Sequence, residues 1–264
     1  MPNYKLALEY NGSDFHGSQA QPNKRTVQGE LETCLNSLYG PEGSIVQNPE
    51  LIFTTFSSRT DTGVHALEQI INFKLEPSIN LRNDFKVLAA INNNLPEDIV
   101  AVKIKEVADS FHARHDATAR EYLYKIFIRR HRPVLRLDSL MWQKEPLDFE
   151  RMAKHATTLV GEQDFSRFAK LEAEDSGLCE VLKSELIQES KLCFKYKIKA
   201  NRFLRHMVRR IVGELIQVGQ GQEASAETCN LSVPASGLCL IDVEYPNCHP
   251  EEPKATSGSL SVPL

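Results

Sequence analysis

One short segment of the sequence combines residue types that can do chemistry. It reads SSRTDTGVHA (residues 57–66) and follows an apolar run from Leu51 to Phe56. Asp61 therefore lies where a strand is expected to pass into a loop, with the guanidinium of Arg59 close enough to pair with it. Gly63 allows a positive φ or a close approach to a ligand. The segment indicates a catalytic carboxylate, although Arg-x-Asp alone also fits an Asp that caps its own turn beside a surface Arg.

A second set of candidate residues is cationic. The spacing of apolar side chains predicts a long helix that starts at Arg202. Its cations would recur at i, i+3, i+4 and i+7 and share one side of that helix: Arg202, Arg205, His206 and Arg209. Its apolar residues would pack on a sheet: Leu204, Met207, Val208, Ile211 and Leu215. A cationic stripe suits a phosphate backbone, and a solvated helix face is the alternative.

The elements that must position these residues alternate between strands and helices. Apolar alternation predicts strands over residues 4–10, 51–56, 69–75, 99–104, 118–128, 180–188, 191–200 and 237–245. Helical spacing predicts helices over residues 26–38, 81–91 and 152–160, besides the one from Arg202. In the strand over 118–128, Tyr122, Tyr124 and Ile126 share a face.

This order predicts an α+β fold of two similar halves, each with a central, mainly antiparallel mixed sheet flanked by helices, and an active cleft between them. We expect residues 1–135 to form the half with the Asp61 loop, and 136–245 the half with the basic helix. Residues 246–264 are rich in Pro, Ser and Glu and are expected to be a disordered tail.

Composition narrows the class of protein. The chain has 264 residues, 41% hydrophobic and 25% charged, so it can bury a core. It has neither a membrane-length apolar run nor a signal or transit leader, so we expect a soluble, cytoplasmic protein, although a mitochondrial address cannot be read here. Six cysteines without a C-x-x-C pair predict reduced thiols and no metal site. The net charge of −4 argues against nucleic acid, but bases gather at 129–132 and 202–210.

Several motifs in order resemble the TruA family of tRNA pseudouridine synthases. The segment RTDTGVHA (59–66) is similar to that family's catalytic loop, and ANRFLRHMVRRIVGELIQVGQG (200–221) to a strand followed by its basic helix. Further segments that match are LEYNGSDFHGSQAQPNKRTVQGELE, INNNLPEDIVAVKI, FHARHDATAREYLYKI, GEQDFSRF and VPASGLCLIDVEYP. The resemblance extends from Tyr4 to about Tyr245.

The resemblance implies a cofactor-free, metal-free isomerase that converts uridine to pseudouridine in tRNA, in the anticodon stem-loop around positions 38 to 40. The target base would flip out of its stack. Asp61 would act on it as nucleophile or by assisting glycosidic cleavage. Arg59 would pair with Asp61, Tyr122 would stack on the uracil, and Leu238 would line the pocket. Arg120, on the same strand face as Tyr122, is a further candidate for substrate binding. Family members are homodimers whose subunits share one tRNA, and no membrane is implied.

Two departures from the family pattern favour an alternative. Ser18 stands where the family commonly has Trp, and the link from Gly221 to Ser232 is too short for the helix usually found there. Both fit an RNA-binding homologue that does little or no chemistry. We expect the strand over 237–245 to dock nevertheless, because its apolar alternation is intact. A carboxylate hydrolase would need a second acid near Asp61, and none is evident.

Overall fold

The computed structural model describes residues 1–39, 51–75, 83–134, 139–170, 176–224 and 229–246. Its strands are β1 Asn3–Tyr10, β2 Thr54–Phe56, β3 His65–Lys74, β4 Ile99–Val107, β5 Ala119–Ile128, β6 Met141–Gln143, β7 Gly161–Asp164, β8 Leu178–Ser190, β9 Cys193–Ala200 and β10 Leu238–Glu244. Its α-helices are α1 Val27–Tyr39, α2 Asp84–Asn94, α3 Phe149–Thr157 and α4 Met207–Gly219. Short 3₁₀ turns are η1 Gly12–Asp14, η3 Ser166–Phe168 and η4 Ala235–Gly237.

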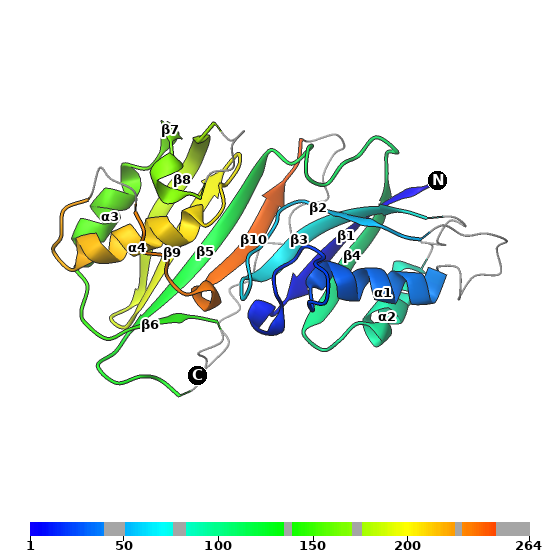
Figure 1. Ribbon diagram of the computed structural model, residues 1–264, viewed down its shortest axis with the longest axis horizontal. Coiled ribbons are helices and arrows are strands. Elements are labelled where there is room, and N and C mark those ends of the chain that lie inside the picture. The colour runs from blue at the N-terminus through cyan, green and yellow to red at the C-terminus, as the bar shows by residue number, and fades with distance from the viewer. Residues whose placement is uncertain (40–50, 76–82, 135–138, 171–175, 225–228, 247–264) are drawn as a thin grey trace.

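All the strands join one ten-stranded sheet in the order β4-β1-β3-β10-β5-β9-β8-β7, with β2 beside β3 and β6 beside β5. Neighbours are antiparallel except β10 with β3 and β5 with β6, which are parallel. In Figure 1 the pair α1 and α2 lies beside the β1–β4 end, and the pair α3 and α4 lies beside the β7–β9 end. The predicted α+β class with a mixed, mainly antiparallel sheet is confirmed.

One face of this sheet forms the core. Cross-strand partners place Tyr10, Ala66, Leu240 and Tyr122 on the same face, and all four are buried. The helices turn their apolar sides into this core, as in α4, where Met207, Val208, Ile211, Val212 and Leu215 are buried. The alternation read from the sequence therefore identifies the covered face correctly.

The closing strand β10 docks as predicted. It pairs with β5 through Leu238↔Tyr124 and Leu240↔Tyr122, and with β3 through Cys239↔His65. β10 lies between β3 and β5 in the sheet. Because β3 begins where the Asp61 loop ends, β10 places that loop one strand away from β5. Residues 229–233 of the preceding link also pack, since the amide of Cys229 donates to the carbonyl of Arg167 at 3.0 Å. Residues 225–228 of that link lie outside the described part.

The helix expected from Arg202 begins instead at Met207, so the predicted stripe along one helix face is wrong. His206 caps the helix with a φ of 65°, in the left-handed region. A right-handed helix cannot continue through such a residue, and residues 202–206 form a separate segment. Boundaries shift elsewhere: the strand expected over 51–56 covers only Thr54–Phe56, and the helix expected over 81–91 is Asp84–Asn94, residues 81–82 being outside the described part. Residues 247–264 of the expected tail are also outside it.

No helix in the described ranges is long and apolar enough to cross a lipid bilayer. Five cysteines among these residues are free thiols: Cys34, Cys179, Cys193, Cys229 and Cys239.

Candidate active site

The Asp61 loop, residues 57–64, leaves β2 and returns to β3 under tight restraint. The amide of Ser57 donates to the carbonyl of Ile70 at 2.8 Å, and its hydroxyl donates to the side chain of Gln69 at 2.7 Å. The Gln69 amide in turn donates to the carbonyl of Ser58 at 2.9 Å. Gln69 is fully buried, so the loop's first residues are held by a polar side chain inside the core.

The opening segment of the chain holds the middle of the loop. The Thr60 amide donates to the hydroxyl of Ser18 at 2.9 Å, and the Ser18 amide donates to the carbonyl of Thr60 at 3.1 Å. The hydroxyls of Tyr10 and Thr60 are hydrogen-bonded at 2.9 Å. Ser18 is fully buried, and its two hydrogen bonds hold the backbone of Thr60 in place.

The end of the loop depends on close backbone approach. Gly63 has a φ of 80°, the positive φ expected for it. A Cβ on Gly12 would lie 2.0 Å from the carbonyl oxygen of Val64, so no larger residue fits there. The Gly12 amide donates to Nδ1 of His65 at 3.1 Å, and Nε2 of His65 lies 3.2 Å from the carbonyl of Ser236. His65 thus connects η1, the loop and η4.

Asp61 lies beside a histidine and an arginine from the start of α4. Its Oδ2 is 3.6 Å from Nε2 of His206 and 3.6 Å from a terminal nitrogen of Arg209. The guanidinium of Arg209 is held in position by a second contact, because its Nε donates to the carbonyl of Val233 at 2.8 Å. Burial lowers the pKa of His206, the nearby Asp61 raises it, and Arg209, Arg205 and Arg210 lower it further. Two of the four predicted RNA-binding residues therefore meet the predicted catalytic acid.

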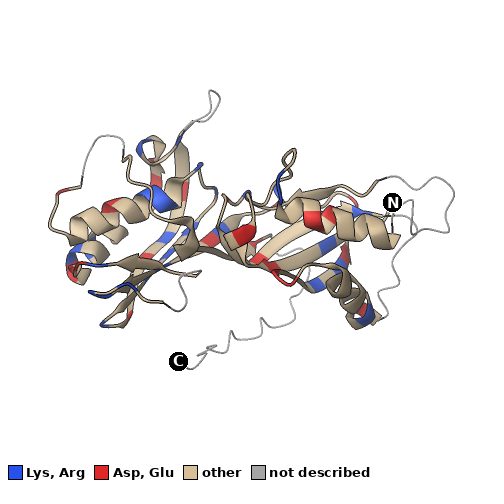
Figure 2. Ribbon diagram, turned by 60° about the horizontal axis from the view of Figure 1, so that its bottom comes forward, with Lys and Arg blue, Asp and Glu red and all other residues tan. Residues whose placement is uncertain are grey.

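The other predicted cations lie around this pair. Arg59 is exposed and, across the part of the chain that the structure describes, forms no ion pair with Asp61. Arg202 and Arg205 are exposed in the segment before α4. Over the whole ribbon, basic and acidic residues are interspersed (Figure 2), so the positive charge near Asp61 is a local feature of a chain with a net charge of −4.

Tyr122 is held at both ends. Its hydroxyl is hydrogen-bonded to the hydroxyl of Ser58 at 2.8 Å, and its ring meets Phe203 edge-on with centroids 5.0 Å apart. Burial raises the pKa of Tyr122 to about 12, with the bond from Ser58 opposing that rise and the charge of Asp61 adding to it. The phenol is therefore neutral at physiological pH, and its position is coupled to the Asp61 loop.

Arg120 makes backbone contacts only among the described residues. Its guanidinium donates to four carbonyls, those of Ala117 at 2.9 Å, Asn201 at 3.0 Å, Ser57 at 3.0 Å and Arg114 at 2.7 Å. These belong to the Asp61 loop, to the segment before β5 and to the segment before α4. Arg120 thus ties together three segments around Asp61.

Leu238 is 5% exposed and faces Tyr124 across the β10–β5 pair, while Leu240 faces Tyr122. Leu238 therefore lies one cross-strand step from Tyr122, on the same face of the sheet. Tyr124 is itself fixed, since its hydroxyl donates to the carbonyl of Pro234 at 2.8 Å.

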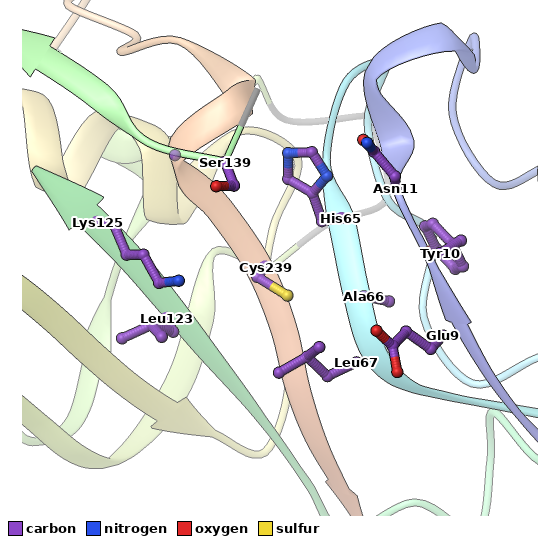
Figure 3. Close-up of a pocket in the computed structure, with 11 residues that line it drawn as sticks. Glu9, Tyr10, Asn11, His65, Ala66, Leu67, Leu123, Lys125, Ser139 and Cys239 are labelled. Carbon is purple, nitrogen blue, oxygen red and sulfur yellow. The ribbon is translucent and has the colours of Figure 1, made fainter. Parts of the chain in front are cut away.

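A cavity of about 220 Å³ lies elsewhere (Figure 3). Its lining includes Glu9, Leu67, Leu123, Lys125 and Cys239. Leu123 and Cys239 alternate with Tyr122 and Leu240 along their strands, so this cavity opens on the other face of the sheet. It contains none of the predicted site residues.

Sequence reasoning did not identify four residues that build the site: Ser18, Ser58, Gln69 and Phe203. Gln69 carried a signal, because a polar side chain at the covered face of an apolar strand must be hydrogen-bonded in the core. Ser18 and Ser58 carried none, since serines are common in loops. Among the described residues, no group of three or more His, Cys, Asp or Glu side chains is placed to hold a metal ion.

Comparison with known proteins identifies relatives of the whole chain. A family model described as tRNA pseudouridine synthase matches residues 155–246. The chain is 34% identical over 264 residues to tRNA pseudouridine synthase A of Leptospira biflexa, covering 95% of this chain and 96% of that protein. It is 36% identical over 256 residues to the protein of the same name from Dictyoglomus thermophilum, covering 93% and 100%. For Coxiella burnetii the identity is 34% over 258 residues, covering 93% and 94%.

The α+β fold and these relatives together identify the chain as an RNA-modifying enzyme. With this similarity over nearly its full length, the chain belongs to the TruA family of tRNA pseudouridine synthases, which are isomerases.

Proposed function

We propose that this protein converts uridine to pseudouridine in the anticodon stem-loop of tRNA, around positions 38 to 40, with Asp61 as the catalytic residue. The observation that carries the proposal is the meeting of Asp61 with His206 and Arg209 at 3.6 Å each. These three residues come from two motifs that are more than 140 positions apart in the printed sequence.

The reaction detaches the uracil from its ribose and rejoins it through carbon, so the base must first leave its stack. In our proposal, the carboxylate of Asp61 acts on the flipped nucleotide, either as nucleophile or by assisting cleavage of the glycosidic bond. Arg209 places positive charge beside this carboxylate and beside the phosphates that flank the target, and the imidazole of His206 lies next to the same carboxylate. The exposed Arg59 enters the space that the base vacates rather than pairing with Asp61 in the free protein.

Tyr122 stacks on the uracil, with Leu238 contributing apolar lining nearby. The ring of Tyr122 is pre-positioned by Ser58 and Phe203, so little rotational freedom is lost on binding. Arg120 acts as a positioning residue for substrate binding, because its nitrogens bond backbone carbonyls of the segments around the site.

Recognition of the stem-loop would use shape and phosphate contacts, with Arg202 and Arg205 as further contacts. We propose that residues 1–135 and 136–245 act as two similar halves bordering an active cleft, and that two copies of the chain share one tRNA. No cofactor or metal is required in this proposal.

The test uses purified protein, tRNA transcripts and pseudouridine mapping by carbodiimide adducts and primer extension. The proposal predicts new stops at positions 38 to 40 where a uridine is present, in buffer containing a chelator. Transcripts with cytidine at those positions serve as the control and should give no stop. Modification confined to other positions would contradict the assigned site, and binding without any modification would favour the RNA-binding alternative.

A further inference from the structure

The loop of residues 112–116, His112–Asp116, has a fixed conformation that no assigned role explains. The amides of Arg114 and His115 both donate to Nδ1 of His112 at 3.2 Å, and the His112 amide donates to Oδ2 of Asp116 at 2.8 Å. The rings of His112 and His115 lie 4.2 Å apart. A loop with so many internal bonds presents its side chains from a set backbone.

Buried residues fasten this loop to the sheet. The Ala113 amide donates to the side chain of Asn72 at 2.8 Å, and the Ala113 carbonyl accepts from the hydroxyl of Tyr245 at 2.7 Å. Ala113 itself is fully buried, whereas Arg114 and His115, the two residues that follow it, are exposed. The loop is thus anchored at its centre and displays two basic side chains to solvent.

The loop borders the active site. One terminal nitrogen of Arg120 donates both to the carbonyl of Arg114 at 2.7 Å and to that of Ser57 at 3.0 Å. One nitrogen of Arg120 therefore bonds a backbone carbonyl of the 112–116 loop and a backbone carbonyl of the Asp61 loop. The other terminal nitrogen bonds Asn201, next to Arg202. Three segments with exposed cations converge on one buried guanidinium.

The charge of Arg114 is not taken up by an ion pair in the described part of the chain, although Asp116 places a negative charge in the same loop. Neither the Arg114 guanidinium nor the His115 ring forms an ion pair there, and Asp116 within the loop is engaged by the His112 amide. A fixed, exposed arginine beside a site that handles an anionic polymer suits phosphate contact, because counterion release then favours binding.

We infer that the 112–116 loop is an RNA-contacting surface in which Arg114 and His115 bind backbone phosphates of the stem-loop held at Asp61. This inference rests on the proposed function. The 112–116 loop, which precedes β5, would add a second RNA-contacting surface to the one proposed at Arg202, Arg205, His206 and Arg209.

The test measures tRNA affinity against salt for Arg114→Gln, for Arg114→Gln with His115→Gln, and for the control Lys191→Gln. Lys191 is exposed in the β8–β9 turn, at the end of the sheet away from Arg120, and its substitution removes the same unit charge. We expect Arg114→Gln to weaken tRNA binding roughly fivefold and to lower the slope of log K against log salt by about one. The double variant should lose more tRNA affinity than Arg114→Gln. Lys191→Gln should have the tRNA affinity and the salt slope of the wild type. All three variants should keep the wild-type kcat at saturating tRNA.

An unchanged salt slope in both loop variants would overturn the inference, as would an equal loss in Lys191→Gln. Either result would leave the proposed function intact, because wild-type modification of positions 38 to 40 is measured separately. A wild type that binds tRNA, with the salt slope falling in the loop variants as expected, but modifies no uridine would contradict the proposed function. That result would still support the 112–116 loop as an RNA-contacting surface. A melting temperature for each variant confirms that the fold is retained.

Discussion

At the scale of single residues, Arg120 organises the site without contacting the acid. Its planar guanidinium satisfies four carbonyls in a fixed fork, which a lysine ammonium cannot reproduce with the same geometry. The residue was identified from its place on the face of Tyr122, and that placement is borne out by its burial at 9% exposure. Its carbonyl partners could not be read from the sequence, because they belong to backbone of three separate segments.

Arg120→Lys should therefore lower the free energy of unfolding by about 2 kcal/mol, since an ammonium cannot donate to all four carbonyls and the bond to Ser57 is buried. Urea denaturation measures the change. The matched control is Arg59→Lys, an exposed position where we expect less than about 0.5 kcal/mol. Equal stabilities for the two variants would show that the carbonyl contacts do not hold the segments together.

The pair formed by Ser58 and Tyr122 allows a double-mutant cycle. Ser58→Ala leaves a phenol that is 5% exposed without its partner and should cost about 1.5 kcal/mol. Tyr122→Phe leaves only the half-buried Ser58 hydroxyl, which can reach water, and should cost less. The double variant should be more stable than the sum predicts, with a coupling near 1 kcal/mol by urea denaturation. Strict additivity would mean that the two hydroxyls do not interact in solution.

At the scale of elements, the position of α4 decides where the cations lie. A long helix from Arg202 was the natural expectation, because apolar spacing is continuous from Leu204 to Leu215. The left-handed φ of His206 interrupts it, and this interruption turns His206 and Arg209 toward Asp61. The spacing of apolar residues carries no information on a single residue with a left-handed φ, so it could not predict where the helix begins. It did predict the buried side of the helix correctly.

A buried charge network fixes α4 against α3 and η3. Glu214 of α4 has a side chain only 3% exposed, accepts from Nε2 of His155 at 2.7 Å and forms a two-pronged ion pair with Arg167. Burial raises the pKa of Glu214, but hydrogen bonds from His155 and Arg167 outweigh it and hold the pKa below its ordinary value of 4.5. The folded state therefore gains stability above that value and loses it as the pH falls through the depressed pKa.

Glu214→Gln should lower stability by about 3 kcal/mol at neutral pH, because it removes the buried negative charge that Arg167 and His155 contact. The gap in stability from the wild type should narrow below about pH 4.5, where the carboxylate of the unfolded wild-type chain takes up a proton, and should close as the pH falls through the depressed pKa of the folded state. Urea denaturation at a series of pH values from 7 to 3 measures it. A difference that stays constant over this range would contradict an ionised Glu214.

At the scale of the whole molecule, β10 makes one sheet out of strands from both ends of the chain. Most strands, the covered face and this closing strand were predictable, because they depend on local apolar alternation. The register that sets Leu240 opposite Tyr122 and Cys239 opposite His65 was not, since it depends on contacts between distant segments.

Hydrogen exchange tests the docking of β10. Its amides from Leu238 to Val243 should be among the slowest to exchange in native conditions, because β5 pairs along the strand and β3 pairs with Cys239 and Leu240. Leu240→Ala, at a fully buried position, should speed that exchange and cost about 3 kcal/mol. Rapid exchange of β10 in the wild type would mean that the sheet is open between β3 and β5.

The most direct test of the account is the release of tritium from tRNA labelled at C5 of uridine, measured in single turnover for Asp61→Asn. The account predicts a loss of more than about a thousandfold in rate with tRNA affinity largely retained, because the acid acts on the base while cations hold the backbone. Asp84→Asn, at an exposed position on α2, is the matched control and should release tritium like the wild type. Turnover by Asp61→Asn at the wild-type rate would contradict the assignment of Asp61 as the catalytic residue.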